Sequence, residues 1–320
     1  MALFKYILRR LLTIFVSVVV VIIITYSLMY IAPGDFFNIS SFTASAGKVS
    51  TLTPEQLQIL IKGFEEKYGL NVPLWKQIWN YLKDAFRFKF GPSFSNPNEP
   101  IEAQIARKFP VTFTLAVLAM LFAVLIGIPL GILAALKKNT WIDYFSMFIS
   151  MIGSIIPAYL IGLIMVIIFS VYLKVLPTSG WGSLKEMIMP VITVGLGPMA
   201  IIARFTRSSL LDTLSQDYIR TAYAKGGTER AVVMRHALKN SLIPVVTVIG
   251  PQLAFLFTGT VWIENLFRVP GLGQLFVNAA AQRDYPLLVT STFILSLSVM
   301  LMNLLVDVIY VFLDPRIKYE

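Results

Sequence analysis

Six long apolar stretches dominate the hydrophobic pattern of the chain, and polar segments separate them. A helix rises about 1.5 Å per residue, so about 20 apolar residues cross the ~30 Å hydrocarbon core of a bilayer. Each stretch is long enough to do so, the fourth only just. We therefore predict an all-α polytopic membrane protein with six transmembrane helices. The expected spans are Leu11–Ile31, Val111–Leu136, Tyr144–Leu173, Met187–Ala203, Leu242–Ile263 and Leu287–Leu313.

The first apolar stretch follows Lys5, Arg9 and Arg10 and contains no charge. A cleaved signal peptide is the competing interpretation, but its apolar core spans only about 7–15 residues. This stretch is longer and runs into Ala32-Pro33-Gly34. We therefore expect residues 1–31 to hold an N-terminal segment and an uncleaved first transmembrane helix.

Proline and glycine interrupt several of the expected helices. Lipid offers no hydrogen bonds to a broken backbone, so breaks are tolerated mainly where a helix faces protein or a water-filled cavity. Pro157 breaks the third span, and we expect breaks in the fourth and fifth. We predict that these two helices line a cavity, with the polar Asn303 as a further wall. The interrupting residues of the fourth and fifth spans are Pro190, Gly195, Gly197, Pro198, Pro244, Gly250 and Pro251.

Two polar segments divide the chain further: residues 32–110 after the first span, and residues 204–241 within the five-helix transmembrane core, 111–320. Short cytoplasmic loops of membrane proteins carry an excess of lysine and arginine. With both termini cytoplasmic, fourteen basic residues fall on internal segments against four on short external loops. The segment 32–110 is then an external insertion. The internal residues are Lys5, Arg9, Arg10, Lys137, Lys138, Arg204, Arg207, Arg220, Lys225, Arg230, Arg235, Lys239, Arg316 and Lys318; the external ones are Lys174, Lys185, Arg268 and Arg283.

The external insertion contains two helix-like patterns. Thr53 can cap a first helix that stops at Gly69. A second, amphipathic stretch runs over residues 74–88 and carries Trp75 and Trp79. These tryptophans either anchor the segment in the aromatic belt of the membrane interface or dock a partner, and the two interpretations are equally favoured. We expect a small helical insertion.

Composition supports the membrane assignment and excludes several kinds of chemistry. The chain is 57% hydrophobic and only 14% charged, against about 25% charged in soluble domains. It has no cysteine and one histidine, His236, so thiolate chemistry and multi-histidine metal sites are excluded. No G-x-x-x-x-G-K-[ST] phosphate loop is present. We expect no catalytic residue, no metal and no cofactor in this chain. The net charge of +10 belongs to its internal loops and does not indicate nucleic acid.

The last apolar stretch contains one charged residue, Asp307. Ionisable groups within membrane helices mark ion pathways in many carriers and channels. A single carboxylate near the inner end of a helix is thin support for ion coupling. An inter-helix hydrogen bond or a salt bridge to an internal arginine is the favoured interpretation.

The internal segment has a helix–glycine–helix pattern. Small residues at Thr221, Ala222 and Ala224 allow close approach by another surface, and Gly226-Gly227 permit a sharp turn with positive φ. Thr228 can cap a second helix, which we expect to end near Asn240-Ser241. Such a motif suits docking into a groove on another protein. The alternative is an ordinary loop whose basic residues meet anionic lipid headgroups.

At this segment the sequence resembles the permeases of binding-protein-dependent ATP-binding-cassette importers. Their signature reads E-A-A, three residues, glycine, nine residues, then I-x-L-P. Here Arg220-Thr221-Ala222 stand at the first three places and Gly226 at the glycine, while His236-Ala237-Leu238-Lys239 replace the final motif. Those departures are typical of the dipeptide, oligopeptide and nickel branch, and the long external insertion resembles its B-type subunit. Further motifs of that branch are APGD at 32–35, YGLNVPL at 68–74, LPTSGW at 176–181, ENLFRVPGLG at 264–273 and DPRIKY at 314–319.

The resemblance implies a permease subunit that translocates di- and oligopeptides in a bacterial inner membrane. Its partners would be a second homologous permease, two cytoplasmic ATPases that hold ATP and Mg, and an external peptide-binding protein. The internal segment would form the coupling helix that contacts an ATPase. The residues to which this role is assigned are Arg220, Thr221, Ala222, Ala224, Lys225, Gly226, Gly227 and Arg230.

A second candidate region follows the fifth span, where Glu264 and Arg268 precede a Pro270-Gly271 turn. With Asn303 and Asp307, these residues are candidates for a pore or external gate. The simpler alternative is a re-entrant turn in which Glu264 pairs with Arg268. Other functions also stay open: a nickel or other small-solute permease of the same family, a stand-alone secondary carrier, or a peptide receptor.

Overall fold

The computed structural model describes residues 2–31, 55, 59, 62, 63, 65, 66 and 68–313, with the side chains of residues 2–4 and 309–313 left aside. Over these residues the chain is helical, and its only strand-like pairing is a bridge between Pro92 and Pro100. The helices are α1 (Ala2–Ile31), α4 (Leu74–Ala85), α5 (Ile101–Leu136), α6 (Trp141–Ile155), α7 (Ala158–Met165), η2 (Val166–Tyr172), α8 (Leu184–Leu214), α9 (Asp217–Ala224), α10 (Glu229–Val232), η3 (Val233–Ala237), α11 (Leu238–Leu266), α12 (Leu272–Ala281) and α13 (Tyr285–Leu313).

The predicted membrane spans are confirmed in number and kind. Five helices are long and apolar enough to cross a bilayer: α1, α5, α8, the continuous helix formed by α10, η3 and α11, and α13. The sixth span is the pair of α6 with α7–η2, which bends by 108°. The chain divides into two compact units, one joining residues up to 110 with 272–300, the other joining 111–271 with the segment from 301.

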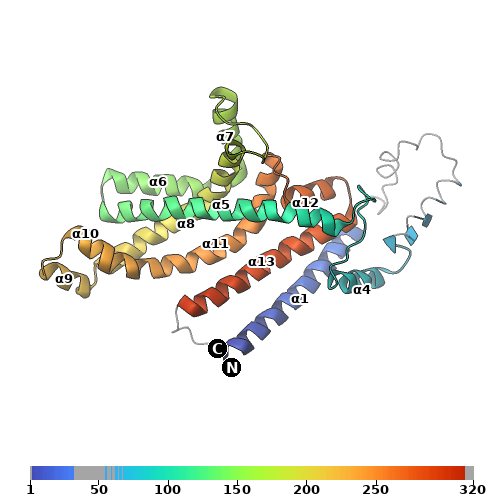
Figure 1. Ribbon diagram of the computed structural model, residues 1–320, viewed down its shortest axis with the longest axis horizontal. Helices are drawn as coiled ribbons and strands as arrows, with labels where there is room; N and C mark the ends of the chain where they lie inside the picture. The colour runs from blue at the N-terminus through green and yellow to red at the C-terminus, as the bar shows by residue number, and fades with distance from the viewer. Residues whose placement is uncertain are drawn as a thin grey trace. The chain divides into compact units, whose positions relative to one another are not determined.

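Pro157 breaks the third span, as predicted. Ile156 has extended backbone angles, φ −78° and ψ 127°, because the ring of a following proline disfavours the helical conformation. In Figure 1, α7 therefore turns steeply away from the line of α6.

The expectation of breaks in the fourth and fifth spans is wrong. Helix α8 continues through Pro190 and Pro198, and α11 continues through Pro244 and Pro251. The fourth span is also much longer than predicted, at 31 residues. Transmembrane helices tolerate internal proline when neighbouring groups satisfy the freed carbonyls. Because α8 and α11 are continuous, the argument from backbone breaks for a cavity along them is lost.

Unit 2 is held together by glycines at helix crossings. A Cβ atom on Gly131 of α5 would lie 2.5 Å from the carbonyl oxygen of Ala203 in α8. A Cβ on Gly153 of α6 would lie equally close, 2.5 Å, to the carbonyl oxygen of Leu196. Small residues let membrane helices approach backbone to backbone, where van der Waals contact replaces the missing hydrophobic force. Figure 1 shows α5, α6 and α8 lying side by side as this packing requires.

Unit 1 has an aromatic core between α1, α4 and α13. Met29, Tyr285 and Val289 are buried there, with Tyr26 and Tyr81 packed against them. The hydroxyl of Tyr81 donates to Thr290 Oγ1 at 3.1 Å. Burial raises the pKa of Tyr81, so the hydroxyl stays protonated and keeps this bond. The core fixes α4, which confirms the predicted amphipathic helix of the insertion.

The insertion is fastened to the start of α13 by Asp284. Its Oδ2 accepts hydrogen bonds from the backbone N–H (2.8 Å) and hydroxyl (2.5 Å) of Ser95. Tyr68 Oη donates to the carbonyl of Ser93 at 3.1 Å, and burial with the nearby charge of Asp284 raises the pKa of Tyr68 to about 12. Gly69 adopts φ +64°, which agrees with the predicted helix stop there. The predicted cap at Thr53 lies outside the described residues.

Candidate functional site

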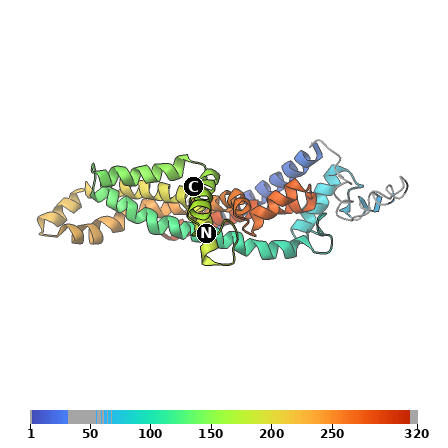
Figure 2. The same ribbon diagram turned by 90° about the horizontal axis from the view of Figure 1, so that it is seen from above.

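The helix–glycine–helix pattern of the sequence forms a short helical hairpin beyond the ends of α6 and α8. Helix α9 carries four of the eight residues to which coupling was assigned, and three more follow it directly in the turn. The eighth, Arg230, lies in α10 after the turn. Figure 1 and Figure 2 both show α9 and α10 at one end of unit 2, beyond the ends of α5 and α6. The outer surface of the hairpin is therefore not covered by the long helices of unit 2.

Glycine ends α9 in a defined geometry. Gly226 has φ +83°, a conformation that side chains with a Cβ rarely adopt. Its N–H donates to the carbonyl of Tyr223 at 2.9 Å, and the N–H of Gly227 donates to that of Ala222 at 3.3 Å. This pair of bonds is a Schellman motif. A Cβ on Gly227 would lie 2.8 Å from Val232, so both glycines are needed for the tight turn.

The helix after the turn starts as predicted but does not end as predicted. Thr228 Oγ1 accepts a bond from the N–H of Ala231, which confirms the cap. The expected end near Asn240-Ser241 is wrong, because α10 passes through the π-helical η3 into α11 without a break. A π-helical turn adds one residue to the helix without interrupting its hydrogen bonds. The hairpin is therefore rigidly continuous with a membrane span.

A small apolar core joins the hairpin to the long helices. Ile219 of α9, Val232 of α10 and Leu210 of α8 are buried together with Ala135 of α5 and Ala237. Ile219 is the only fully buried side chain of α9. Burial of a side chain of this size stabilises by about 1.5–3 kcal/mol. The core attaches α9 to α8 and α10.

Two hydrogen bonds reinforce this attachment. Asn240 Nδ2 donates to Tyr218 Oη at 2.9 Å, which ties α9 to the start of α11. Ser209 Oγ donates to the carbonyl of Ser241 at 2.7 Å, which ties α8 to the same helix.

The structure sorts the predicted coupling residues into two groups. Ala222 and Gly227 are half-buried and build the turn. The others are exposed and available to a partner: Arg220, Thr221, Ala224, Lys225, Gly226 and Arg230. Arg220 lies 3.6 Å from Asp217, but both side chains are so exposed that this ion pair adds little stability.

Three exposed apolar side chains of the hairpin region were not predicted. Tyr218 and Tyr223 on α9 are 44% and 41% exposed, and Met234 in η3 is 61% exposed. Tyrosine and methionine are enriched in the centres of protein interfaces. Helical spacing gave no signal for them, because Tyr218 and Tyr223 are five residues apart and do not share a helix face. Only the structure showed that these side chains are exposed. The hairpin thus combines aromatic contact area with basic charge.

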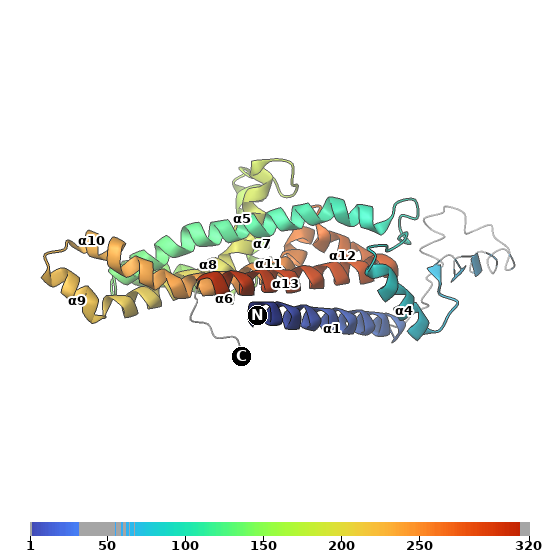
Figure 3. The same ribbon diagram turned by 60° about the horizontal axis from the view of Figure 1, so that its bottom comes forward.

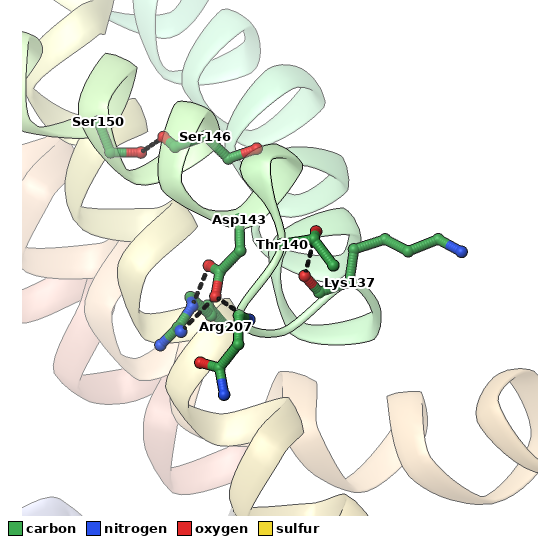
Figure 4. A network of polar contacts seen from close by, with 7 residues as sticks. Lys137, Thr140, Asp143, Ser146, Ser150 and Arg207 are labelled. Atoms are coloured by element: carbon green, nitrogen blue, oxygen red, sulfur yellow. Dashed lines mark hydrogen bonds and ion pairs between the residues drawn. The ribbon is translucent and has the colours of Figure 1, made fainter.

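A buried ion pair next to the hairpin also escaped the sequence analysis (Figure 4). Arg207 of α8 donates from Nε to Asp143 Oδ1 at 2.6 Å and from Nη2 to Asp143 Oδ2 at 2.7 Å. The N–H of Asn139 donates to the same carboxylate at 3.0 Å. Asp143 is 1% exposed, whereas the Arg207 side chain is 27% exposed, so the carboxylate is buried and its cation is only partly so. It locks the beginning of α6 to the part of α8 that leads into α9.

The second candidate region is built around Gly271. Glu264, in the last turn of α11, is fully buried, whereas Arg268 is exposed and has φ +52°. A Cβ on Gly271 would overlap the Glu264 carboxylate and lie 2.5 Å from Thr112 Oγ1. The N–H of Val269 donates to the Glu264 carbonyl at 2.8 Å. The turn after α11 therefore folds back over a buried carboxylate and a hydroxyl.

Asn303 and Asp307 stand apart in sequence from this turn, in the second half of α13. Asn303 is exposed and Asp307 is half-buried. Within the described residues no group of three histidine, aspartate or glutamate side chains is placed to hold a metal ion. A pore or gate role for Glu264, Arg268, Asn303 and Asp307 stays a prediction.

Two family models together match most of the chain. Residues 127–319 match the binding-protein-dependent transport system inner membrane component, and residues 3–116 match the N-terminal component of the same transport systems. The first match includes the hairpin, the Asp143–Arg207 pair and the Gly271 turn.

Relatives over the full length come from several bacteria. The chain is 38% identical over 314 residues to the dipeptide transport system permease protein DppB of Bacillus subtilis (strain 168), covering 98% of each chain. It is 36% identical to DppB of Lactococcus lactis subsp. cremoris (strain MG1363), covering 98% of this chain and 99% of that one. It is 37% identical to the glutathione transport system permease protein GsiC of Escherichia coli (strain K12), covering 99% of each.

A solved structure supports the fold. A chain of the MetNI methionine ABC transporter, in inward-facing conformations, superposes with a TM-score of 0.57 at 20% identity. The match covers 68% of this chain and 99% of that chain. The helical arrangement is thus one that a chain of a known ABC transporter adopts.

Proposed function

We infer the function from the family to which the chain belongs, the inner membrane components of binding-protein-dependent transport systems, in which it is the permease subunit of an ATP-binding-cassette importer. We propose that it carries di- and oligopeptides inward across a bacterial inner membrane, with both termini in the cytoplasm. The full-length relatives named for dipeptide and glutathione transport support peptides as the substrate class. The basic residues ahead of the first span support the orientation.

Its partners in this proposal are a second homologous permease, two cytoplasmic ATPases and an external peptide-binding protein. This chain has no ATPase site of its own, and the absence of a phosphate loop from its sequence supports that division of labour. ATP and Mg are then held by the partner ATPases. The permease contributes the transport pathway and a contact surface on which the ATPases act.

The single observation that carries the coupling proposal is the helical hairpin of α9 and α10. Its outer face offers Arg220, Lys225 and Arg230 together with Tyr218 and Tyr223 to a groove on an ATPase. Basic residues provide steering and aromatic residues provide contact area. Closure of the ATPases around ATP would displace this hairpin.

The attachment of the hairpin determines where such a displacement goes. Ile219 is buried against α8 and α10, and α10 continues into α11. A close-packed core has low compressibility, so a displacement of one helix is transmitted to the helices packed against it. Motion of α9 would therefore reach two membrane spans directly, and α6 through the Asp143–Arg207 pair.

Two variants of the hairpin test the proposal. Gly226→Val puts a branched side chain where φ is +83°, and Ala224→Trp adds bulk to an exposed position without backbone strain. In proteoliposomes with all partner subunits, both should abolish ATP-dependent peptide uptake. Asn98→Trp adds the same bulk to an exposed residue of the insertion and should leave uptake near wild type. Normal uptake by both hairpin variants in an assembled complex would exclude this hairpin as the coupling element.

The substrate class needs a separate measurement. Competition between labelled dipeptide, longer peptides and nickel for uptake by the complete importer should show displacement by peptides only. Nickel-driven displacement would favour the alternative of a nickel or other small-solute permease. Gradient-driven peptide flux through the reconstituted chain alone would instead identify a secondary carrier.

A further inference from the structure

Unit 1 contains a cavity of about 420 Å³ between the external insertion, the C-terminal end of α1 and the start of α13. Figure 3 shows α4, which forms one of its walls, beside the C-terminal half of α1. Binding sites for small molecules usually measure about 300–1,000 Å³. Among the described residues that line the cavity, none belongs to the coupling hairpin or to the Gly271 turn. The cavity is therefore separate from both regions described above.

Aromatic rings form the apolar part of the cavity wall. Tyr68 lies edge-to-face on Phe94 with ring centroids 4.6 Å apart, and Tyr81 meets Tyr26 in the same way at 5.5 Å. Each of these rings is held at a fixed angle by its neighbour. The face of an aromatic ring attracts ammonium groups, and it stacks on apolar side chains. The six rings on the wall are those of Tyr26, Tyr68, Tyr81, Phe90, Phe94 and Tyr285.

Two groups of opposite charge belong to the same wall. Asp84 lies in the last turn of α4, and the N–H of Lys89 donates to its carbonyl at 3.0 Å, which keeps the two residues close together. Both residues line the cavity and both are exposed. In the part of the chain that the structure describes, neither side chain forms an ion pair or a hydrogen bond. The carboxylate of Asp84 and the ammonium group of Lys89 are therefore available to a ligand.

Glycine leaves two points of the wall without a side chain. Gly69 has φ +64° and Gly91 has φ +73°, and a Cβ atom on either would meet no protein atom within 4 Å. Glycine suits this backbone conformation and allows a ligand to approach the main chain closely. Asn80 of α4 adds an exposed amide to the wall. The cavity thus combines aromatic surface with one acidic, one basic and one amide side chain.

We propose that this cavity binds a small zwitterion, a free amino acid or a dipeptide. The ammonium group of the ligand would lie on Asp84 and the aromatic rings, and its carboxylate would pair with Lys89. A ligand with charge of only one sign would leave one of these two side chains unpaired, so both together favour a zwitterion. The inference goes beyond import itself, because it does not depend on which solute the permease carries. Since the wall includes residues of α1, α4 and α13, an occupant would hold the insertion to two membrane spans.

The absence of cysteine from the chain allows a test that needs no transport. Asn80→Cys places one thiol on the cavity wall, and Asn98→Cys places one on an exposed residue of the insertion that does not line the cavity. The complete importer in nanodiscs is treated with a charged maleimide, and labelling of this chain is followed with phenylalanine, with alanyl-phenylalanine and with neither. At least one probe should slow labelling of Asn80→Cys and leave Asn98→Cys unchanged. The probe that acts at the lower concentration identifies the amino acid or the dipeptide as the preferred ligand.

The two charges are tested in the Asn80→Cys background. Acetylation of the ammonium group of the better probe, or amidation of its carboxylate, should each weaken protection by roughly tenfold. Asp84→Asn should remove only the preference for the free ammonium group, and Lys89→Gln only the preference for the free carboxylate. Lys83→Gln, an exposed change on α4 outside the cavity wall, is the matched control and should alter neither preference.

Three results would overturn the proposal. Absence of protection by both probes would exclude a zwitterion site, and equal protection by the doubly blocked, uncharged derivative would mean that the cavity selects apolar groups only. Protection that requires the external binding protein would mean that a segment of that protein fills the cavity. ATP-dependent peptide uptake by each variant is measured separately, so failure of the proposed import function cannot be mistaken for failure of this site.

Discussion

Arg207 of α8 holds Asp143 of α6 through two parallel hydrogen bonds of 2.6 and 2.7 Å. The arginine fork matches both carboxylate oxygens, which gives the pair its orientation as well as its strength. Asp143 is the third residue of α6, where a negative charge also complements the helix dipole. The pair therefore joins the start of α6 to α8 near the hairpin.

Removal of Arg207 should destabilise the permease, because it leaves a buried carboxylate without its cation. The expected cost of Arg207→Ala is up to about 3–5 kcal/mol. Arg207→Lys keeps the charge but loses the two parallel hydrogen bonds of the guanidinium. Its free energy of unfolding should therefore lie between those of the wild type and Arg207→Ala. The measurement is denaturant unfolding of the purified protein in detergent.

Arg204→Ala is the matched control for this prediction. Arg204 lies one turn away on the same helix, is exposed, and bonds only a serine hydroxyl at 3.3 Å. Arg204→Ala should change the free energy of unfolding by less than about 1 kcal/mol. Equal effects of the two alanine variants would show that the buried pair has no special role.

The crossing of α5 and α8 depends on Gly131. Gly131→Ala brings a methyl group to 2.5 Å from the Ala203 carbonyl, a contact that backbone cannot relieve without moving a helix. Overpacking of this kind costs about 1–3 kcal/mol. Gly197→Ala, whose nearest neighbour would be 3.5 Å away, shares the change in helix propensity and isolates the overlap. Thermal unfolding should rank Gly131→Ala well below Gly197→Ala, and an equal midpoint for both would refute this packing.

Loss of Asp284 should release the segment that contains Ser95. Asp284→Ala removes the acceptor of two Ser95 bonds and of the N–H of Leu287 at 3.2 Å. Hydrogen exchange at residues 93–98 should accelerate, by roughly tenfold for each 1.4 kcal/mol of lost protection. Ser95→Ala removes only one bond and should give a smaller acceleration. Unaltered exchange in Asp284→Ala would mean that the segment is held by other contacts.

The turn after α11 gives a prediction for transport. Gly271→Ala would push a methyl group into the Glu264 carboxylate and the Thr112 hydroxyl, so we expect peptide uptake by the complete importer to fall. Gly259→Ala meets nothing closer than 3.8 Å and should transport normally. Glu264→Ala separates the two interpretations of the region: unchanged uptake and unchanged affinity for the binding protein would identify a simple turn.

The sequence predicted several local features correctly because local chemistry controls them. Gly226 has the positive φ that its place after α9 required, and Thr228 caps α10. Pro157 breaks the third span because the ring disfavours a helical residue before it. Each of these outcomes depends on a few neighbouring residues.

The errors fall where neighbours in space decide. Pro190 and Pro244 carry the same ring as Pro157, yet α8 and α11 continue through them. Asn240-Ser241 looked like a helix end, but Ser241 is buried against α8 and its carbonyl accepts a bond from Ser209. Local propensity was overruled in both places by helices that pack alongside.

What the sequence determined by itself is the number of membrane spans, the family and the turn chemistry of the hairpin, since these follow from apolar length, ordered motifs and single residues such as Gly226. Only the tertiary structure paired Arg207 with Asp143, separated by 64 positions, and set Phe86 against Phe15. The hydrophobic periodicity of one helix does not specify which residues of another helix it will contact. Those contacts arise when close glycine crossings and buried aromatic rings bring distant helices into register.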